Sequence, residues 1–320
     1  MNNFSAEERL ALTESIRLLL SNESDERAVR ATMDTPSGYD AKLWEELSKM
    51  GVVGLIVDEV HGGAGVGPIE LELVMEEVGA ALLCSPLLAS GVQAAALLRE
   101  LGDTELNDRL LPRIADGSSI ATVAMTGKSG CWTQDGVAVS GQQVEGKWRL
   151  SGSASFVIHG QNADVLLVLA TTSEGLECFV VESNAAGLDM TALPTFDHTL
   201  RLAEISFDGV KSERVAARGD VWDAVSRAMD LTLVALAGEQ TGAAQRCLSM
   251  AVEYAKTRVQ FGRAIGSFQA IKHMAADLLL ETESALSAAR NAAARLADDD
   301  GDATEAVSLA AFACADAFVT

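Results

Sequence analysis

The segment AVEYAKTRVQFGRAIGSFQAIKHMAAD, residues 251–277, contains the clearest structural signal in the sequence. Its first part suits a helix that passes through Tyr254 and ends near Gly262, because glycine readily adopts the left-handed conformation that terminates helices. Ser267 is a favourable N-cap for a second helix, so Gln269 falls in the first turn of that helix. The segment therefore predicts two long helices joined by a short turn.

Positive charge is concentrated around this predicted turn. Five basic residues and one acidic residue lie between Arg246 and Lys272, a local charge of +4 in a chain whose formal net charge is −22 at pH 7. Backbone N–H groups, the helix dipole, the guanidinium of Arg258 and the amide of Gln269 together suit a pyrophosphate. The same pattern also suits a salt-bridged helical hairpin with a solvated basic face, so the residues alone leave both interpretations open.

The chain as a whole is acidic, and its composition excludes several classes of function. With 24 Lys and Arg against 46 Asp and Glu, its surface is unsuited to nonspecific binding of nucleic acids or anionic membranes. The N-terminus lacks the basic start and apolar core of a signal peptide, and the five cysteines show no metal-binding spacing. We therefore expect a soluble, reduced, cytoplasmic protein without a metal site.

The apolar pattern changes twice along the 320 residues and predicts a mainly α-helical protein with a central β domain. Residues 1–118 form an expected N-terminal α-helical domain, residues 119–217 a middle β domain, and residues 218–320 a C-terminal helical bundle. Long helices are expected at about 221–261, 267–297 and 304–320. Because strands and helices do not alternate, the order argues against a Rossmann core.

The string Arg258-x-Gln260-Phe261-Gly262, followed by Phe268-Gln269, resembles the signature of the acyl-CoA dehydrogenases. The glycine-rich segment 51–65 resembles part of the N-terminal helical domain of the same family, and the resemblance covers essentially the whole chain. It implies a helical domain, a β-barrel-like domain and a helical bundle, with FAD bound at a dimer interface.

The resemblance also implies roles for individual residues. Arg258 and Gln269 match an arginine and a glutamine that clasp the pyrophosphate of the flavin housed mainly by the neighbouring subunit. Phe261 matches a phenylalanine near the adenosine portion, and Gln260 lies in the same cofactor-binding signature. The implied reaction is α,β-dehydrogenation of an acyl-CoA thioester: a carboxylate removes the α-proton while FAD accepts a hydride from the β-carbon.

The sequence departs from the family pattern where the catalytic carboxylate is expected. Thr232 and Leu233 occupy the helix positions at which some members carry the base and a substrate-contacting arginine. The other family position for the base, a glycine-rich FAD segment and the last helices of the bundle would lie beyond Thr320. We interpret the nearby Asp230 and Glu239 as ordinary helix residues, so the catalytic base is unknown.

The expected flavin-ring site is also altered. The family's threonine-glutamate-proline stretch corresponds to residues 125–128 and retains only Thr126, while its Trp-Ile-Thr strand corresponds to residues 156–158. Ile158 cannot donate the hydrogen bond that the family's threonine supplies. Phe156 suits contact with the flavin ring and equally suits a hydrophobic core.

These features resemble the less-conserved subunit of heterotetrameric bacterial acyl-CoA dehydrogenases. The leading hypothesis is a dehydrogenase subunit in an α2β2 heteromer, where it completes the FAD site of a homologous partner, with an electron-transfer flavoprotein or similar acceptor. An acyl-CoA substrate from lipid or steroid catabolism follows by analogy. The alternatives are a self-sufficient homo-oligomeric dehydrogenase, and a non-catalytic structural partner or a flavin oxidase or oxygenase on the same fold.

Overall fold

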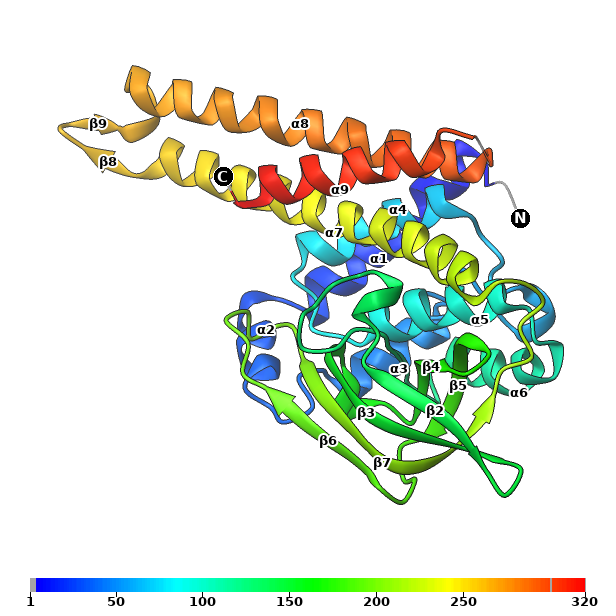
Figure 1. The fold of residues 1–320 in the computed structure, drawn as a ribbon. Coiled ribbons are helices and arrows are strands. Elements are labelled where there is room, and N and C mark those ends of the chain that lie inside the picture. Colours follow the sequence, from blue (N-terminus) through cyan, green and yellow to red (C-terminus); the bar gives the residue numbers. More distant parts are fainter. Residues whose placement is uncertain (1–3, 300, 320) are drawn as a thin grey trace. The chain divides into compact units, whose positions relative to one another are not determined.

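The computed structural model describes residues 4–299 and 301–319, and its contacts group them into two compact units (Figure 1). Unit 1 contains the described residues of Met1–Arg27, Gly67–Leu83 and Leu233–Thr320. Unit 2 contains Ala28–Val66 and Cys84–Thr232. The fold class expected from the sequence, mainly α-helical with a central β region, is confirmed. The division into three domains by residue number stays a prediction.

The helices flank the strands in the chain order, as the periodicity predicts. The α-helices are α1 Ala6–Glu23, α2 Glu26–Met33, α3 Ala41–Lys49, α4 Pro68–Ala80, α5 Ala95–Leu101, α6 Thr104–Ala115, α7 Val221–Thr257, α8 Gln269–Ala297 and α9 Ala303–Val319. A π-helical segment, Leu88–Ala94, leads directly into α5.

Unit 1 is a bundle of α1, α4, α8, α9 and the part of α7 from Leu233 onward. Its core is rich in alanine, which allows helix backbones to approach closely; the core residues are Val234, Ala237, Ala285, Ala289, Ala292, Ala293, Val307, Ala310 and Cys314. Glycines make the crossing of α4 and α7 closer still. A Cβ added at Gly242 would collide with the carbonyl of Glu76, and one at Gly79 would collide with the carbonyl of Glu239. Only glycine fits these two positions.

Unit 2 contains a β-barrel. Its strands are β1 Ala121–Ala124, β2 Val139–Val144, β3 Lys147–Ile158, β4 Val165–Thr172, β5 Gly175–Glu182, β6 Leu188–Leu193 and β7 Leu202–Arg214. The pairings β4–β2, β2–β3, β3–β7, β7–β5 and β5–β4 close a ring, with β1 added to β4 and β6 added to β7. Closure satisfies strand edges that would otherwise be unpaired, and Leu150, Val168, Phe179 and Ile205 fill the interior.

Strand β6 has little signal in the sequence pattern. Its sequence, LDMTAL, lacks a continuous β-branched or aromatic run and ends beside Pro194. Residues 188–193 pair antiparallel with the first half of β7, from Leu202 to Phe207. Pairing with β7, the next strand along the chain, and not local propensity therefore creates this strand.

The expected boundaries of the α7–α8 turn are wrong in detail. Helix α7 ends at Thr257 and not near Gly262, because two short strands, β8 Val259–Gln260 and β9 Arg263–Ala264, form a hairpin there. Ser267 is not the N-cap of α8: its hydroxyl donates to the carbonyl of Ala264 at 2.7 Å, and Phe268 occupies the cap position. The hairpin uses residues that a continuous helix would have required.

Candidate functional site

The α7–α8 connection brings four of the predicted site residues together. Arg258 directly follows α7, and its N–H donates to the carbonyl of Tyr254 at 2.8 Å. The N–H of Ile265 donates to the carbonyl of Arg258, also at 2.8 Å, which ties the two ends of the hairpin together. Gln260 and Phe261 lie in this hairpin, and Gln269 is the first residue of α8. The connection therefore gathers the whole predicted clasp in unit 1.

The clasp has donors available for an anion. The first turn of α8 has no side-chain cap, so its N–H groups point away from the helix without intrahelical acceptors. Within the described residues, the side chains of Arg258, Gln269 and Lys272 make no hydrogen bond or ion pair with protein groups. Gln260 differs, because its amide donates to the carbonyl of Val259 at 2.9 Å. Cationic and amide donors at a helix N-terminus fit the diphosphate portion of FAD.

Phe261 stands at the tip of the hairpin and is 93% exposed. Its φ of +54° is unusual for a bulky residue. Its ring meets the ring of Phe268 edge-on, with centroids 6.2 Å apart, and the Arg263 guanidinium lies 4.0 Å from the Phe268 centroid. In the sequence, Arg263 is one of the five basic residues and Phe268 is part of the family signature, but residue spacing carries no signal for a stack of this kind.

Thr126 and Phe156 both lie in unit 2. Thr126 is hydrogen-bonded to Ser155, the residue that precedes Phe156. The Thr126 hydroxyl donates to the carbonyl of Ser155 at 3.3 Å, and the Ser155 N–H donates to the carbonyl of Thr126 at 2.8 Å. Phe156 follows within a β-bulge of β3, with a φ of +59°. The bulge turns its ring outward, and at 49% exposure Phe156 is not the core residue that was one interpretation of the sequence.

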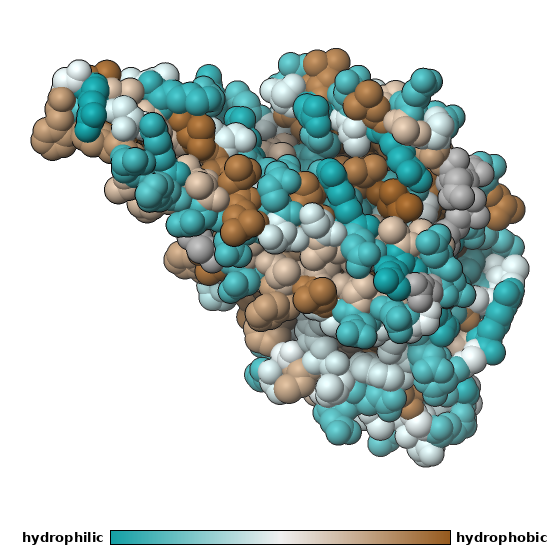
Figure 2. Space-filling view, turned by 90° about the horizontal axis from the view of Figure 1, so that it is seen from above, coloured by the Kyte–Doolittle hydropathy of each residue, from teal (hydrophilic) through white to brown (hydrophobic). Residues whose placement is uncertain are grey.

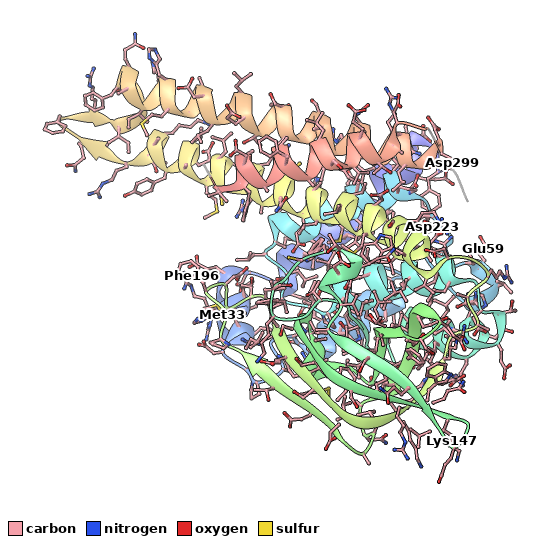
Figure 3. All side chains as sticks on the ribbon, in the orientation of Figure 1. Met33, Glu59, Lys147, Phe196, Asp223 and Asp299 are labelled. Atoms are coloured by element: carbon pink, nitrogen blue, oxygen red, sulfur yellow. The ribbon has the colours of Figure 1, made fainter. Side chains whose placement is uncertain are left out.

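An apolar hollow of about 420 Å³ opens beside Phe156. The connection between β6 and β7 forms its other side, with Leu193, Pro194, Leu200 and Leu202 as apolar lining. Phe196 also lines the hollow and is fully exposed on this connection (Figure 3). The described lining contains Asp197 and no cation, so the hollow suits an apolar group and offers nothing to a phosphate.

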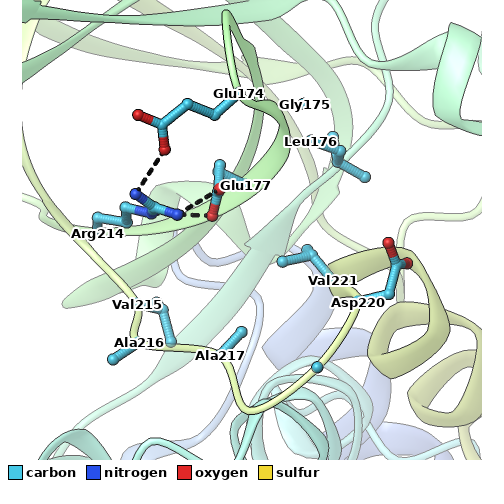
Figure 4. Close-up of a pocket in the computed structure, with 11 residues that line it drawn as sticks. Glu174, Gly175, Leu176, Glu177, Arg214, Val215, Ala216, Ala217, Asp220 and Val221 are labelled. Carbon is cyan, nitrogen blue, oxygen red and sulfur yellow. Dashed lines mark hydrogen bonds and ion pairs between the residues drawn. The ribbon is translucent and has the colours of Figure 1, made fainter.

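A second cavity in unit 2, of about 530 Å³, is unsuited to a phosphate for a different reason (Figure 4). Arg214 is the one cation among its described lining residues, and two carboxylates already hold it. Its Nη2 and Nε bind Glu177 at 2.6 and 3.0 Å, and its Nη1 binds Glu174 at 2.9 Å. The guanidinium is therefore committed to the β5–β7 edge of the barrel.

The helix position expected for a catalytic base has no carboxylate. Thr232 is buried in α7, and its hydroxyl donates to the carbonyl of Ala228 at 2.7 Å. Leu233 follows it, so the adjacent arginine position is apolar. Asp230 and Glu239 also lie in α7, and each interacts with other residues of the protein.

The most strongly perturbed carboxyl group lies elsewhere, inside the bundle of unit 1. Glu72 on α4 is 1% exposed, and burial together with the charge of Glu76 raises the pKa of Glu72 to about 9. Glu76 is held by Arg290 of α8 through contacts of 3.0 and 3.1 Å. Glu72 Oε1 has no hydrogen-bond partner among the described groups. We assign this pair a role in how the stability of the bundle depends on pH, and none in the reaction.

The described residues also lack the features of two other classes of function. No described helix is both long and apolar enough to cross a membrane. No group of three or more His, Cys, Asp or Glu side chains in that part of the chain is arranged to hold a metal ion.

Comparison with known proteins places these features in one family. Residues 6–118 match the family described as acyl-CoA dehydrogenase, N-terminal domain, and residues 219–320 match acyl-CoA dehydrogenase, C-terminal domain. The chain is 33% identical to acyl-CoA dehydrogenase IpdE2 of Mycolicibacterium smegmatis over 282 residues, which cover 88% of this chain and 75% of that one.

Two solved structures are similar over nearly the whole chain. A variant of the Tcur3481–Tcur3483 steroid ACAD is 30% identical with a TM-score of 0.87, covering 98% of this chain and 84% of that one. The ChsE4–ChsE5 complex from Mycobacterium tuberculosis is 29% identical with a TM-score of 0.88, covering 99% and 85%. The chain belongs to the acyl-CoA dehydrogenase family, whose members are FAD-dependent flavoproteins.

Proposed function

We propose that this chain is one subunit of a heteromeric acyl-CoA dehydrogenase, in which its α7–α8 connection completes an FAD site housed mainly by a homologous partner. The observation that carries the proposal is an asymmetry between two parts of the chain. The connection offers Arg258 and Gln269 with uncommitted donors for a diphosphate. The expected ring site offers the apolar Phe156 and a Thr126 hydroxyl that already donates to a backbone carbonyl.

The surface around the clasp supports contact with another subunit. We call residues 244–281 the arm; they form the last turns of α7, the hairpin and the first turns of α8, and none of them is buried. The arm exposes large apolar side chains, namely Met250, Tyr254, Val259, Phe261, Met274, Leu279 and Leu280. Figure 2 shows apolar atoms at the surface of the molecule among polar ones. An isolated pair of helices with so much exposed apolar surface gains stability when a partner covers it.

The division of labour follows from the residues present. When bound, FAD would supply the hydride acceptor, with an electron-transfer flavoprotein or a similar acceptor as the proposed redox partner. In this chain Arg258 and Gln269 would bind the diphosphate and orient the cofactor. Thr232 cannot remove a proton from carbon, and in the proposed assembly the partner supplies the carboxylate for the site that this chain completes.

The substrate class rests on the similar proteins. One of the two similar structures is described as a steroid ACAD, and the other is a complex of two differently named chains. These similarities support a heteromer and a steroid-derived acyl-CoA substrate. We propose an α2β2 assembly in the cytoplasm that acts on the CoA thioester of such an acyl group in lipid catabolism.

Flavin content tests the proposal directly. The chain is produced alone and together with a homologous subunit from the same genome, and bound FAD is measured by absorbance after gel filtration. We expect a colourless chain alone and flavin in the complex. Stoichiometric FAD and acceptor-dependent acyl-CoA oxidation by the chain alone would instead establish the self-sufficient homo-oligomer.

Substitutions in the clasp test its assignment within the complex. Arg258→Ala and Gln269→Ala each remove a phosphate contact worth about 1–3 kcal/mol, so FAD dissociates more readily. Arg246→Ala is the matched control, because it removes an exposed positive charge from the same basic window but lies several turns earlier on α7. Equal flavin retention by all three variants would contradict the clasp.

A further inference from the structure

The tip of the α7–α8 hairpin has a backbone conformation that its sequence does not favour. Phe261 and Gly262 are the two turn residues between β8 and β9, and both have positive φ, at +54° and +75°. Two-residue hairpin turns with this geometry prefer Asn, Asp or Gly at the first position, because a bulky side chain is strained there. Phenylalanine at position 261 therefore needs support from neighbouring side chains.

Phe268 provides that support through two contacts of its ring. The Phe261 and Phe268 rings form an edge-to-face pair with an interplanar angle of 86°, and the Arg263 guanidinium lies over the Phe268 ring. Stacking of a cation on an aromatic face is favourable, as is an edge-to-face aromatic pair. Phe268 is also the N-cap residue of α8, directly before Gln269. Arg263 thus connects the hairpin tip to the start of α8.

The hairpin in turn sets the position of Arg258. The backbone carbonyl of Arg258 accepts a hydrogen bond from the N–H of Ile265, the residue that follows β9. A hairpin that loses its shape therefore moves the Arg258 backbone as well as Phe261. Arg263 itself has no carboxylate partner among the described residues, and its contact with Phe268 is the one that orients it.

We propose that Arg263 is a positioning residue: by stacking on Phe268 it holds the strained hairpin so that Arg258, Phe261 and Gln269 face one ligand. This inference rests on the proposed FAD clasp and adds a residue to it. Its rival is a role for Arg263 as a direct phosphate ligand, in which the charge matters and the ring contact does not.

The experiment combines a measurement on the ligand-free chain with flavin retention in the complex. Two variants, Arg263→Gln and Phe268→Leu, each remove the stack, and Arg263→Lys keeps a cation that can stack. The control is Lys272→Gln, which removes an exposed charge from the first turn of α8. Amide exchange at Ile265, followed by NMR, reports on the hairpin independently of flavin. We expect Arg263→Gln and Phe268→Leu to speed this exchange about two- to five-fold. Arg263→Lys restores part of the protection, and Lys272→Gln leaves the exchange unchanged.

Flavin retention separates positioning from direct contact. If Arg263 acts through Phe268, both changes break the same stack, so their effects on FAD retention do not add. The double variant Arg263→Gln/Phe268→Leu then retains as much FAD as whichever single variant retains less. Additive losses of FAD with unchanged exchange at Ile265 would overturn the proposal in favour of direct contact. Faster exchange without any loss of FAD, in a complex that Arg258→Ala does impair, would also overturn it. If Arg258→Ala has no effect on FAD, the clasp itself is wrong, and the exchange data then show a purely structural stack.

Discussion

Replacing Glu72 by glutamine is expected to make unit 1 more stable at neutral and alkaline pH. The carboxyl group is buried on α4 and carries a proton in the folded state, because burial and the charge of Glu76 raise its pKa from 4.5 to about 9. Residues from three other helices surround the pair. Arg290 on α8 binds Glu76, and Cys314 on α9 lies near Glu72. The backbone of α7 at Gly238 packs against the backbone of Glu72. Glutamine keeps the size of the side chain and a hydrogen-bond donor for Glu76, but it does not titrate over this pH range.

The sign and size follow from the two pKa values. Between pH 4.5 and 9 the unfolded chain has released this proton and the folded chain retains it, so folding becomes less favourable as pH rises. Each pH unit contributes at most about 1.4 kcal/mol, which gives an upper bound of about 4 kcal/mol at pH 7.5. Below pH 4.5 both states are protonated, and the variant has no advantage.

Urea unfolding from pH 4 to 9 measures this difference in the free energy of unfolding. We expect the curves of Glu72→Gln and the unchanged protein to coincide near pH 4 and to diverge above pH 5, with the variant more stable. Glu305→Gln is the matched control, because Glu305 is an exposed carboxylate on α9 in the same bundle. A pH-independent difference, or a variant less stable than the unchanged protein at pH 8, would refute the argument.

Three further predictions concern packing, strain and the arm. Gly242→Ala places a methyl group against an α4 carbonyl and is expected to destabilise the chain by about 1–3 kcal/mol in urea unfolding. Gly219→Ala, where a Cβ meets nothing within 4 Å, is the control. Phe261→Asn relieves a positive φ, so we expect stability to rise by up to about 1 kcal/mol in the same assay while FAD retention in the complex falls. The exposed Cys131 and Cys247 are expected to react quickly with a thiol reagent in the isolated chain. Since Cys247 lies in the arm, assembly with the partner protects it and leaves Cys131 reactive; equal reactivity in the complex would contradict the arm as an interface.

Much of the architecture could be predicted from the sequence because it depends on local patterns. The change from helical periodicity to short β-favouring runs and back predicts the helix–sheet–helix order. The signature from Arg258 to Gln269 identifies the family, since several residue types recur at fixed spacing. The absence of a carboxylate at Thr232 is likewise visible in the sequence alone.

Other features depend on contacts between residues that no local pattern relates. The hairpin that ends α7 at Thr257, and the stack of Arg263 on Phe268, arise from a turn conformation that Phe261 does not favour by itself. Strand β6 exists because β7 offers a free edge.

The acid pair Glu72 and Glu76 on α4 shows the same division most clearly. Glu72 and Glu76 have the spacing of an ordinary polar face of a helix, and Glu72 becomes buried only because α4 packs with α7, α8 and α9. The sequence by itself determined the family and pointed to the residues of the proposed clasp, because these are encoded in types and spacing. Only the tertiary structure decided which carboxylates lose water and how the clasp residues are held, because desolvation and orientation depend on distant parts of the chain that pack together.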